Sequence, residues 1–335
     1  MALLADIDFV PELFLSYQQE INQAQSAFFR SGIIAQNDLI TQAFQQGGRE
    51  IVIPFFDDLS GEDEVLSDVI GLTPAQIGSG RQTGVRNLRG RAWQSSDLAA
   101  ELAGSDPMMA IAQRTGEYWV RRVQATLIAQ LVGLFGAGGP LAASNAVGGN
   151  STALTGAQIV KAIAKLGDSG KRLTAIAMHS APYYYLVEQD LIIPAASPAI
   201  VPTSQLDTRI SGEMLEMGTY GGRTVFVDDT LPVSIGTGTG GTNVYTSYLF
   251  GRGAFAYAEI LPKQSVETDR NILKGIEVLV NRKEYLLHPV GMAFQGTVAG
   301  NSPTNTEFQD VSAYSQAFSD NRNIRMVALR SFIPN

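Results

Sequence analysis

One amphipathic segment of about thirty residues constrains the fold of this chain more than any other feature of the sequence. Asp106 is a candidate N-cap, Pro107 takes the first helical position, and Gly136 follows the end of the segment. Apolar residues recur between these positions at helical spacing: Met109, Ala112, Val120, Val123, Leu127, Leu131 and Leu134. A helix of this length extends roughly 45 Å at about 1.5 Å per residue, so we expect a long spine against which a smaller unit packs.

The rest of the chain keeps helical and strand-like patterns apart. We expect a short helix over 37–44, another over 155–166 and a third beginning at Pro182. Residues 51–56 have the pattern of a strand, and Pro54 confines that strand to the edge of a sheet. Further strands are expected at 173–179, 223–229, 243–250, 254–260, 276–289 and 324–332. This segregation predicts an α+β fold.

The composition points to a protein that buries surface against other copies of itself. Charged residues make up 17% of the chain and hydrophobic residues 45%, whereas an average soluble protein has roughly 25% charged residues. The chain is also acidic, with 32 Asp and Glu against 24 Lys and Arg and a net charge of -8. Because proteins grip nucleic acid through basic side chains on phosphates, this balance favours enclosing DNA over binding it tightly.

Several functional classes are excluded or disfavoured. The chain has no cysteine, which excludes disulfides, thiolate zinc sites and cysteine nucleophiles. Residues 1–14 carry acids where a signal peptide needs basic residues. Residues 127–147 are the best membrane candidate, but Gln130 and Pro140 interrupt them, so we interpret them as a helix end and a loop. We therefore expect a soluble, intracellular protein without a membrane span.

The most asymmetric charge distribution lies between 57 and 91. Residues 57–68 hold six acids and no base, and residues 81–91 hold four arginines and no acid. Gly71, Pro74 and two further glycines separate them, which is typical of a long two-armed loop. Two interpretations are equally open on spacing alone: solvated arms, whose exposed ion pairs contribute about 0–1 kcal/mol each, or a clasp on a neighbouring subunit. The candidate contact residues are Asp57, Asp58, Glu62, Asp63, Glu64, Asp68, Arg81, Arg86, Arg89 and Arg91.

Motifs that could carry chemistry have simpler explanations. Residues 167–170 spell GDSG, but no histidine precedes Ser169 as the order of trypsin-like proteases requires. Residues 236–241 match GxGxxG, yet a strand follows where dinucleotide binding needs a helix, so we expect a hairpin tip. The pair at 228–229 fits a turn, and His179 and His288 fit structural positions. We expect no catalytic residue, no metal and no cofactor.

Two long stretches carry a family resemblance. Residues 92–135 contain Trp93, a DPM triplet at 106–108 and a Tyr-Trp pair at 118–119, and resemble a stretch of the major capsid proteins of tailed phages. Residues 265–294, with Arg282 among the shared positions, are a second match. The resemblance covers about 40–295. It implies the Hong Kong 97-type α+β capsid fold, with an N-terminal arm, an extended loop, a spine helix, and peripheral and axial domains.

That resemblance implies an order of domains along the chain. The N-terminal arm falls on 1–50, the extended loop on 51–95 and the spine helix on about 106–136. The peripheral domain takes 96–190 and the strands of 255–335, and the axial domain takes 191–254. The charged segment coincides with the family's extended loop, which favours the clasp.

The resemblance also implies the function and the partners. We expect a non-enzymatic subunit that forms hexamers and pentamers of an icosahedral shell, assembled in the host cytoplasm around double-stranded DNA. About fifty residues precede the loop, so we expect a separate scaffolding protein, together with a portal and, as a further candidate, a decoration protein. No lysine precedes Lys161, so a lysine cross-link from this loop is excluded. The alternatives are an encapsulin-type compartment shell and, from GDSG alone, a serine hydrolase.

Overall fold

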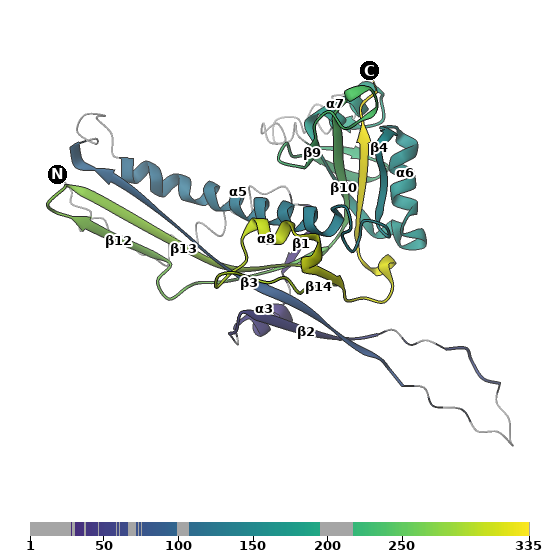
Figure 1. Cartoon of the computed structure of the whole chain (residues 1–335), viewed down its shortest axis with the longest axis horizontal. Helices are drawn as coiled ribbons and strands as arrows, with labels where there is room; N and C mark the ends of the chain where they lie inside the picture. The colour runs from purple at the N-terminus through teal and green to yellow at the C-terminus, as the bar shows by residue number, and fades with distance from the viewer. Residues whose placement is uncertain are drawn as a thin grey trace, which may run out of the picture.

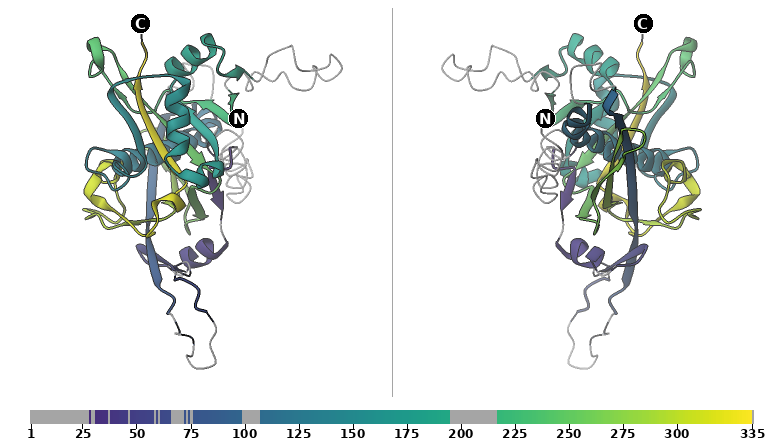
Figure 2. Two further views of the ribbon diagram at one scale, coloured as in Figure 1. Left: turned by 90° about the vertical axis from the view of Figure 1, so that its right-hand side faces the viewer. Right: turned by 90° about the vertical axis from the view of Figure 1, so that its left-hand side faces the viewer.

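The computed structural model describes residues 28, 31–36, 38–45, 47–57, 59, 61–65, 72, 74, 76–98, 107–194 and 217–334. An elongated body carries the longest helix and one sheet, a thicker block at one end carries a second sheet, and a thin two-stranded loop projects from the body (Figure 1). The two side views show that the loop points away from the block that holds the C-terminus (Figure 2).

The longest helix has the extent that the sequence predicts. Helix α5 spans Pro107–Phe135, and 29 residues form it without interruption. Trp119, Val123, Leu127 and Leu131 are buried along one face, as helical periodicity requires. The other helices of the described residues are α3 (Asp38–Gln45), α6 (Gly156–Ala164), α7 (Ser180–Glu188) and α8 (Asn305–Gln309).

The first sheet lies along α5 and supplies the elongated body. Its order is β1-β11-β13-β3-β2, with β12 paired to β13. The strands are β1 (Ile34–Gln36), β2 (Glu50–Phe56), β3 (Ser79–Ser96), β11 (Phe255–Ile260), β12 (Val266–Asn271) and β13 (Ile276–Pro289). Strand β2 is at the edge, which confirms the prediction from Pro54. A small separate sheet pairs β14 (Met292–Phe294) with β15 (Tyr314–Gln316).

The central pairing of the first sheet is long and antiparallel. Strand β3 pairs with β13 from Arg86 opposite Leu286 to Ser96 opposite Ile276. Because successive residues of a strand point to opposite faces, Arg89 and Tyr285 share the face toward α5, while Arg86 and Glu284 share the other face. The basic segment at 81–91 is therefore part of an 18-residue strand and not a free loop arm as we expected, since its backbone is needed to pair both β2 and β13.

The second sheet forms the block beside one end of α5. Its order is β4-β16-β10-β5-β8-β7-β6, with β9 paired to β10. The strands are β4 (Ala146–Ala153), β5 (Leu173–Met178), β6 (Ile193–Pro194), β7 (Met217–Tyr220), β8 (Arg223–Val227), β9 (Val233–Ser234), β10 (Val244–Gly251) and β16 (Met326–Phe332). Strands β4, β5 and β16, which lie outside residues 191–254, thus share a sheet with β6 to β10, which lie within that range. The expected domain boundaries do not follow this grouping.

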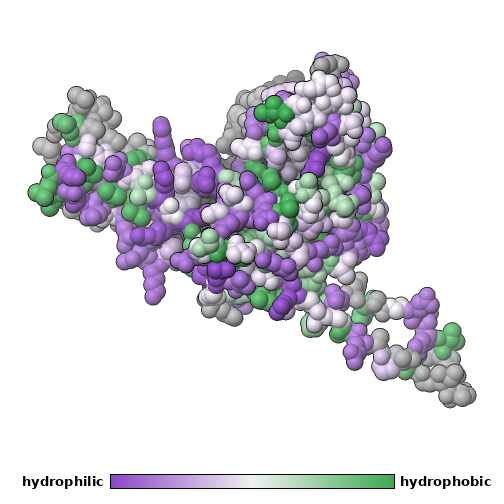
Figure 3. Space-filling view, viewed as in Figure 1, coloured by the Kyte–Doolittle hydropathy of each residue, from purple (hydrophilic) through white to green (hydrophobic). Residues whose placement is uncertain are grey.

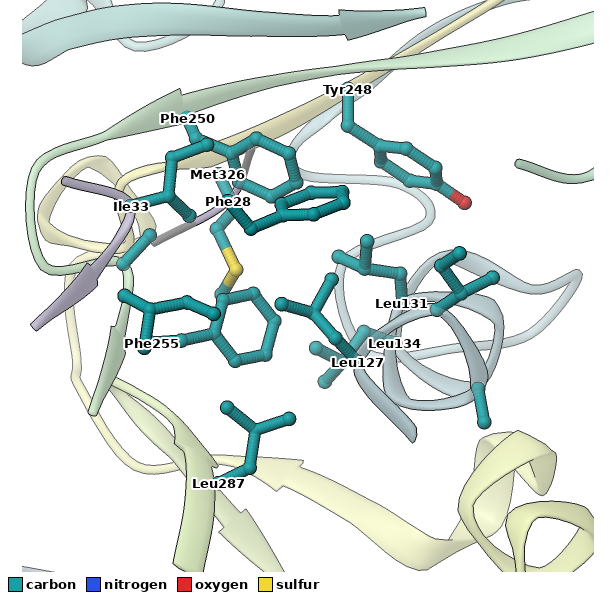
Figure 4. Packing of buried hydrophobic residues seen from close by; sticks show 14 of the residues in the cluster. Phe28, Ile33, Leu127, Leu131, Leu134, Tyr248, Phe250, Phe255, Leu287 and Met326 are labelled. Carbon is teal, nitrogen blue, oxygen red and sulfur yellow. The ribbon is translucent and has the colours of Figure 1, made fainter. Parts of the chain in front are cut away.

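A single apolar core joins the two sheets to the C-terminal half of α5. Leu127, Leu131 and Leu134 of the helix point toward Phe250 and Phe255, which come from β10 and β11 (Figure 4). Tight packing on the opposite side of the helix needs Gly133, because a Cβ there would lie 2.3 Å from the carbonyl oxygen of Phe308. Two smaller cores lie under α6 and α7 and under α3. The arrangement confirms the α+β expectation.

Candidate assembly interface

The segment between β2 and β3 projects from the body with apolar side chains in solvent. Phe56 is 75% exposed, Leu59 81% and Val65 92%, and Leu72 and Ile77 are also exposed. The space-filling view shows hydrophobic residues on this projecting loop (Figure 3). Large apolar patches on a soluble surface mark sites of interaction, so this loop is the first candidate for an interface between subunits.

The acidic candidates lie on the outgoing arm of that loop. Glu62, Asp63 and Glu64 are exposed. Asp57 lies at the base of the loop, where its N–H donates to the carbonyl of Gly78 at 2.9 Å and holds the two arms together. Asp58 and Asp68 fall outside the described residues.

Arg86 is engaged inside its own subunit. Its guanidinium pairs with Glu284 on β13, donates to the carbonyl oxygen of Phe44 at 2.6 Å, and lies 4.6 Å from the centre of the Phe44 ring. Both side chains of the ion pair are largely buried. These contacts fasten α3 to the first sheet, so the charge of Arg86 is already matched without a neighbour.

The other three arginines of β3 differ from one another. Arg89 donates from Nη2 to the carbonyl oxygen of Pro303 at 2.5 Å and to Oδ1 of Asn305 at 3.2 Å, which ties it to the start of α8. Arg81 and Arg91 are exposed and form no ion pair with any of the residues that the structure describes. For all four arginines of β3, Arg86 included, a contact with another subunit remains a prediction. Arg81 is the one nearest the projecting loop.

The opposite end of the body carries a second group of exposed apolar residues. Ile272 is 84% exposed and Leu273 98%, both at the turn between β12 and β13, and Leu98 is exposed after β3. Arg270 pairs with Asp97 at 2.6 Å and fixes that turn to the end of β3. Sequence reasoning missed the apolar residues at both ends. The sequence pattern that could have revealed them is an apolar residue among acidic or turn residues. Such a residue belongs to no helical or strand periodicity that would place it in a core.

The motifs of the hydrolase alternative do not assemble into a site. Ser169 lies in a 3-10 turn over Gly167–Arg172. His179 instead caps α7, and its Nδ1 accepts from the N–H of Ala181 at 3.2 Å. Ser180 Oγ and Asp229 Oδ1 both lie 3.3 Å from that same nitrogen. A catalytic triad needs its serine and its carboxylate on different ring nitrogens, so this group cannot relay a proton between them.

The remaining motif residues also take structural positions. Hydrogen bonds from Ser180 hold the pKa of Asp229 below its usual value. Asp228 accepts from Gln124 Nε2 at 2.7 Å and from the N–H of Thr230 at 2.9 Å, which links α5 to the turn after β8. Residues 236–241 form the tip between β9 and β10, as expected for a hairpin. Among the described residues no group of three metal-binding side chains gathers.

His288 is a buried residue of β13 in the first sheet. Its Nε2 lies 3.2 Å from Oε1 of Gln82, which also accepts from the N–H of Gly291 at 2.8 Å. Burial lowers the pKa of His288 to about 4, because the low-dielectric surroundings disfavour the charged ring. The histidine is a neutral structural residue, in agreement with the prediction.

Comparison with known proteins then decides the family. No known protein-family model matches the sequence. The chain is 39% identical over 325 residues to the major capsid protein of Bacillus phage SPP1, and the match covers 96% of this chain and 95% of that protein. This chain belongs to the phage major capsid proteins. It is a structural subunit of the virion capsid, and this identification supports the phage head over the encapsulin-type shell.

Solved structures show the same capsid fold at low sequence identity. The capsid protein of Ralstonia phage GP4 superposes with a TM-score of 0.62 at 10% identity, over 93% of this chain and 92% of that one. The capsid protein of cyanophage Pam1 gives a TM-score of 0.59 at 11% identity, over 92% and 93%. These matches confirm the α+β phage capsid fold. The curated relative is a structural protein, while the lack of any enzymatic activity stays a prediction.

No helix among the described residues is long and apolar enough to cross a membrane. Helix α5 is the longest candidate, and Arg114, Glu117, Arg121 and Arg122 interrupt its apolar pattern.

Proposed function

We propose that this capsid subunit assembles as hexamers and pentamers into an icosahedral head around double-stranded DNA, and that its β2–β3 loop clasps the neighbouring subunit. The β2–β3 loop means residues 57–78, the segment that projects from the body in Figure 1. The scaffolding protein, portal and decoration protein implied by the family resemblance remain proposed partners.

The observation that carries the clasp is the exposure of apolar side chains along this loop. Val65 has 92% of its surface in water and Leu59 81%. Burying such a side chain contributes about 1.5–3 kcal/mol. A free subunit gains none of this, whereas a subunit whose loop lies on its neighbour gains it at every copy of the contact.

The charges on the loop orient the same contact between subunits. Glu62 and Asp63 are exposed on the outgoing arm, and Arg81 is exposed where the returning strand begins. Opposite charges on the two arms favour a neighbour that presents the same surface in a shifted position, which is the arrangement in a ring of identical subunits. Because no lysine lies in the loop, the clasp is non-covalent.

We also propose a division of the chain that follows the sheets. The first sheet with α5 forms the peripheral domain, and it includes β1 and α3, which the sequence placed in the N-terminal arm. The second sheet forms the axial domain and includes β4, β5 and β16, which the sequence placed in the peripheral domain. Shared cores support this division, because α6 and α7 pack on the second sheet and α3 packs on the first.

Electron microscopy of the purified protein, with and without a candidate scaffolding protein, tests the assembly. Rings or closed shells are expected, and subunits that stay monomeric under every condition contradict the proposal. The clasp is tested separately with Val65→Ser. Its matched control is Val160→Ser, which removes an apolar side chain that is 55% exposed on α6.

Val65→Ser is expected to give no shells or fragile ones, while the free energy of unfolding of the subunit changes by less than about 0.5 kcal/mol. Val160→Ser is expected to assemble normally. Shells of normal yield and stability from Val65→Ser refute the clasp and leave the capsid function standing.

A further inference from the structure

A small polar cavity lies between α5, the first sheet and the start of α8. Its volume is about 130 Å³, which corresponds to roughly four water molecules at about 30 Å³ each. Arg89 of β3, Arg122 and Thr126 of α5, Tyr285 of β13 and Asn305 of α8 line it. None of its described lining residues is an aspartate or a glutamate. Two arginine side chains therefore line one partly open space without a carboxylate between them.

Arg89 is held in place but not satisfied. Its Nη2 donates to the carbonyl oxygen of Pro303 and to Asn305, as described above, which fixes the plane of the guanidinium. Its Nε is buried and has no hydrogen-bond partner in the described part of the chain. That nitrogen has almost no accessible surface, so a ligand in the cavity can meet this guanidinium only through its other nitrogens.

Arg122 supplies the second charge from the open side of the cavity. It is exposed on α5 and forms no ion pair within the described residues. The carboxylate electrostatically linked to Arg89 is that of Glu307, and its oxygens already accept from the N–H groups of Ala299 and Thr304. Those hydrogen bonds lower the pKa of Glu307, with a smaller contribution from Arg89. Glu307 thus serves the cap of α8, and the cavity keeps its positive charge.

Two hydroxyl groups complete the lining. Thr126 Oγ1 and the hydroxyl oxygen of Tyr285 lie 3.0 Å apart, and both are buried. Thr126 Oγ1 donates to the carbonyl oxygen of Arg122 at 3.1 Å, so the Tyr285 hydroxyl, whose pKa burial raises, is the donor to Thr126. The two planar guanidinium groups are therefore the part of the lining that matches the oxygens of a tetrahedral oxyanion.

A separate shallow groove lies along α5 on another side of Tyr118. This groove has a volume of about 240 Å³, and Arg114, Arg121, Trp93 and Tyr118 line it. Tyr118 belongs to both spaces. Arg114 and Arg121 of α5 line this groove together with aromatic rings, in a chain with a net charge of -8.

We propose that the cavity between Arg89 and Arg122 binds a phosphate group, either as the free ion or as a phosphate of a nucleic acid backbone. Binding of the free phosphate ion does not depend on the proposed capsid function. Binding of a backbone phosphate rests on that function, because the site then needs DNA inside the shell. In that case α5 and β3 are part of a surface that contacts the enclosed DNA.

Calorimetric titration of the full-length, unassembled subunit with inorganic phosphate, in chloride buffer at constant ionic strength, tests the site. Arg122→Gln removes one guanidinium that has no ion pair with a described residue, so the variant is expected to fold, which circular dichroism and its unfolding midpoint in chloride verify. Arg121→Gln is the matched control, because it removes the same charge from the adjacent residue, outside the cavity.

Arg122→Gln is expected to weaken phosphate binding about tenfold, and Arg121→Gln less than about twofold, since a hydrogen bond to a charged group contributes more than a distant charge. Equal affinities of wild type and Arg122→Gln overturn the proposal, as does the absence of saturable binding to the wild type.

A second titration with a short duplex DNA separates the two sources of phosphate. If the ligand is a backbone phosphate, DNA competes with inorganic phosphate, and Arg122→Gln lowers the slope of log K against log salt by about one. If inorganic phosphate binds and DNA does not compete, the free ion is the ligand and the proposal holds in that form. Neither titration needs shells, so a failure of assembly does not affect them.

Discussion

Trp119 of α5 donates its indole N–H to Oδ1 of Asn281 on β13 at 2.7 Å, and both residues are buried. Asn281 lies opposite Arg91 in the pairing of β13 with β3. A hydrogen bond in this place joins the longest helix to the longest strand pairing beyond the apolar core, which reaches only the C-terminal half of α5. It ties the middle of α5 to the first sheet.

Asn281→Leu is expected to lower the free energy of unfolding of the subunit by about 1–3 kcal/mol, because it leaves the indole N–H of Trp119 buried without an acceptor. The measurement is denaturant unfolding of the unassembled subunit, followed by circular dichroism. Trp119→Phe in the Asn281→Leu background removes the orphaned donor, so the double variant should lose less than the sum of the single losses. Additive losses contradict a direct bond.

Arg86→Ala is expected to destabilise the subunit by about 3 kcal/mol, because it leaves Glu284 largely buried without its partner and removes the contact with the Phe44 ring. Arg81→Ala on the same strand is the control, and as an exposed residue it should change stability by less than about 0.5 kcal/mol. Comparable effects of the two substitutions would show that Arg86 is no part of the folded core. Charge reversal at Arg86 therefore cannot test the clasp.

Arg81→Glu is expected to impair shell formation without unfolding the subunit, because it places a negative charge where the clasp needs a positive one. Glu62→Lys combined with Asp63→Lys should impair assembly in the same way, and all three substitutions together should restore part of it. Yield and salt sensitivity of shells by electron microscopy and sedimentation provide the measurement. If Arg81→Glu gives normal shells, the proposal that opposite charges hold the clasp is refuted.

Stability of the subunit is expected to fall as the pH drops from about 6.5 to about 4, because of His288. Its pKa is lowered to about 4 in the folded state, while an unfolded histidine titrates near 6.5. Between these values the unfolded chain binds the additional proton, so unfolding becomes easier as protons are added, by about 3 kcal/mol across the window. Below about 4 this contribution no longer changes with pH.

Denaturant unfolding at a series of pH values measures this slope. His288→Gln is expected to flatten it between about 6.5 and 4, because glutamine does not titrate there. His179→Gln, which removes the other histidine of the chain from the start of α7, serves as the control and should keep the slope. An unchanged slope in His288→Gln shows that other groups cause the acid sensitivity.

Local patterns in the sequence were sufficient for most of the individual elements. Asp106-Pro107 and Gly136 bound the long helix, and α5 spans Pro107–Phe135. The alternating pattern at 276–289 is β13, and the edge position that Pro54 predicted for β2 is confirmed. These predictions hold because capping, helical periodicity and the missing N–H of proline act over a few residues.

The grouping of strands could not be predicted in the same way. Strand β16, at the end of the chain, pairs with β10 and also with β4, although β4 ends at Ala153 and β16 begins only at Met326. The resemblance implies a peripheral domain of 96–190 and 255–335, whereas we propose that β4, β5 and β16 belong to the axial domain with the rest of their sheet. Which strands share a sheet depends on side-chain packing across the core, and that packing leaves no local mark.

The sequence by itself determined the helix that organises this protein, the separation of acidic from basic residues around the loop, and, through resemblance, the family. Only the tertiary structure decided what each arginine of β3 does. The alternation of a strand sends Arg86 to Glu284 on one face and Arg89 to the α5 cavity on the other. A row of like charges in sequence thus becomes an internal ion pair, a candidate phosphate site and an exposed contact, because opposite faces of one sheet meet different partners.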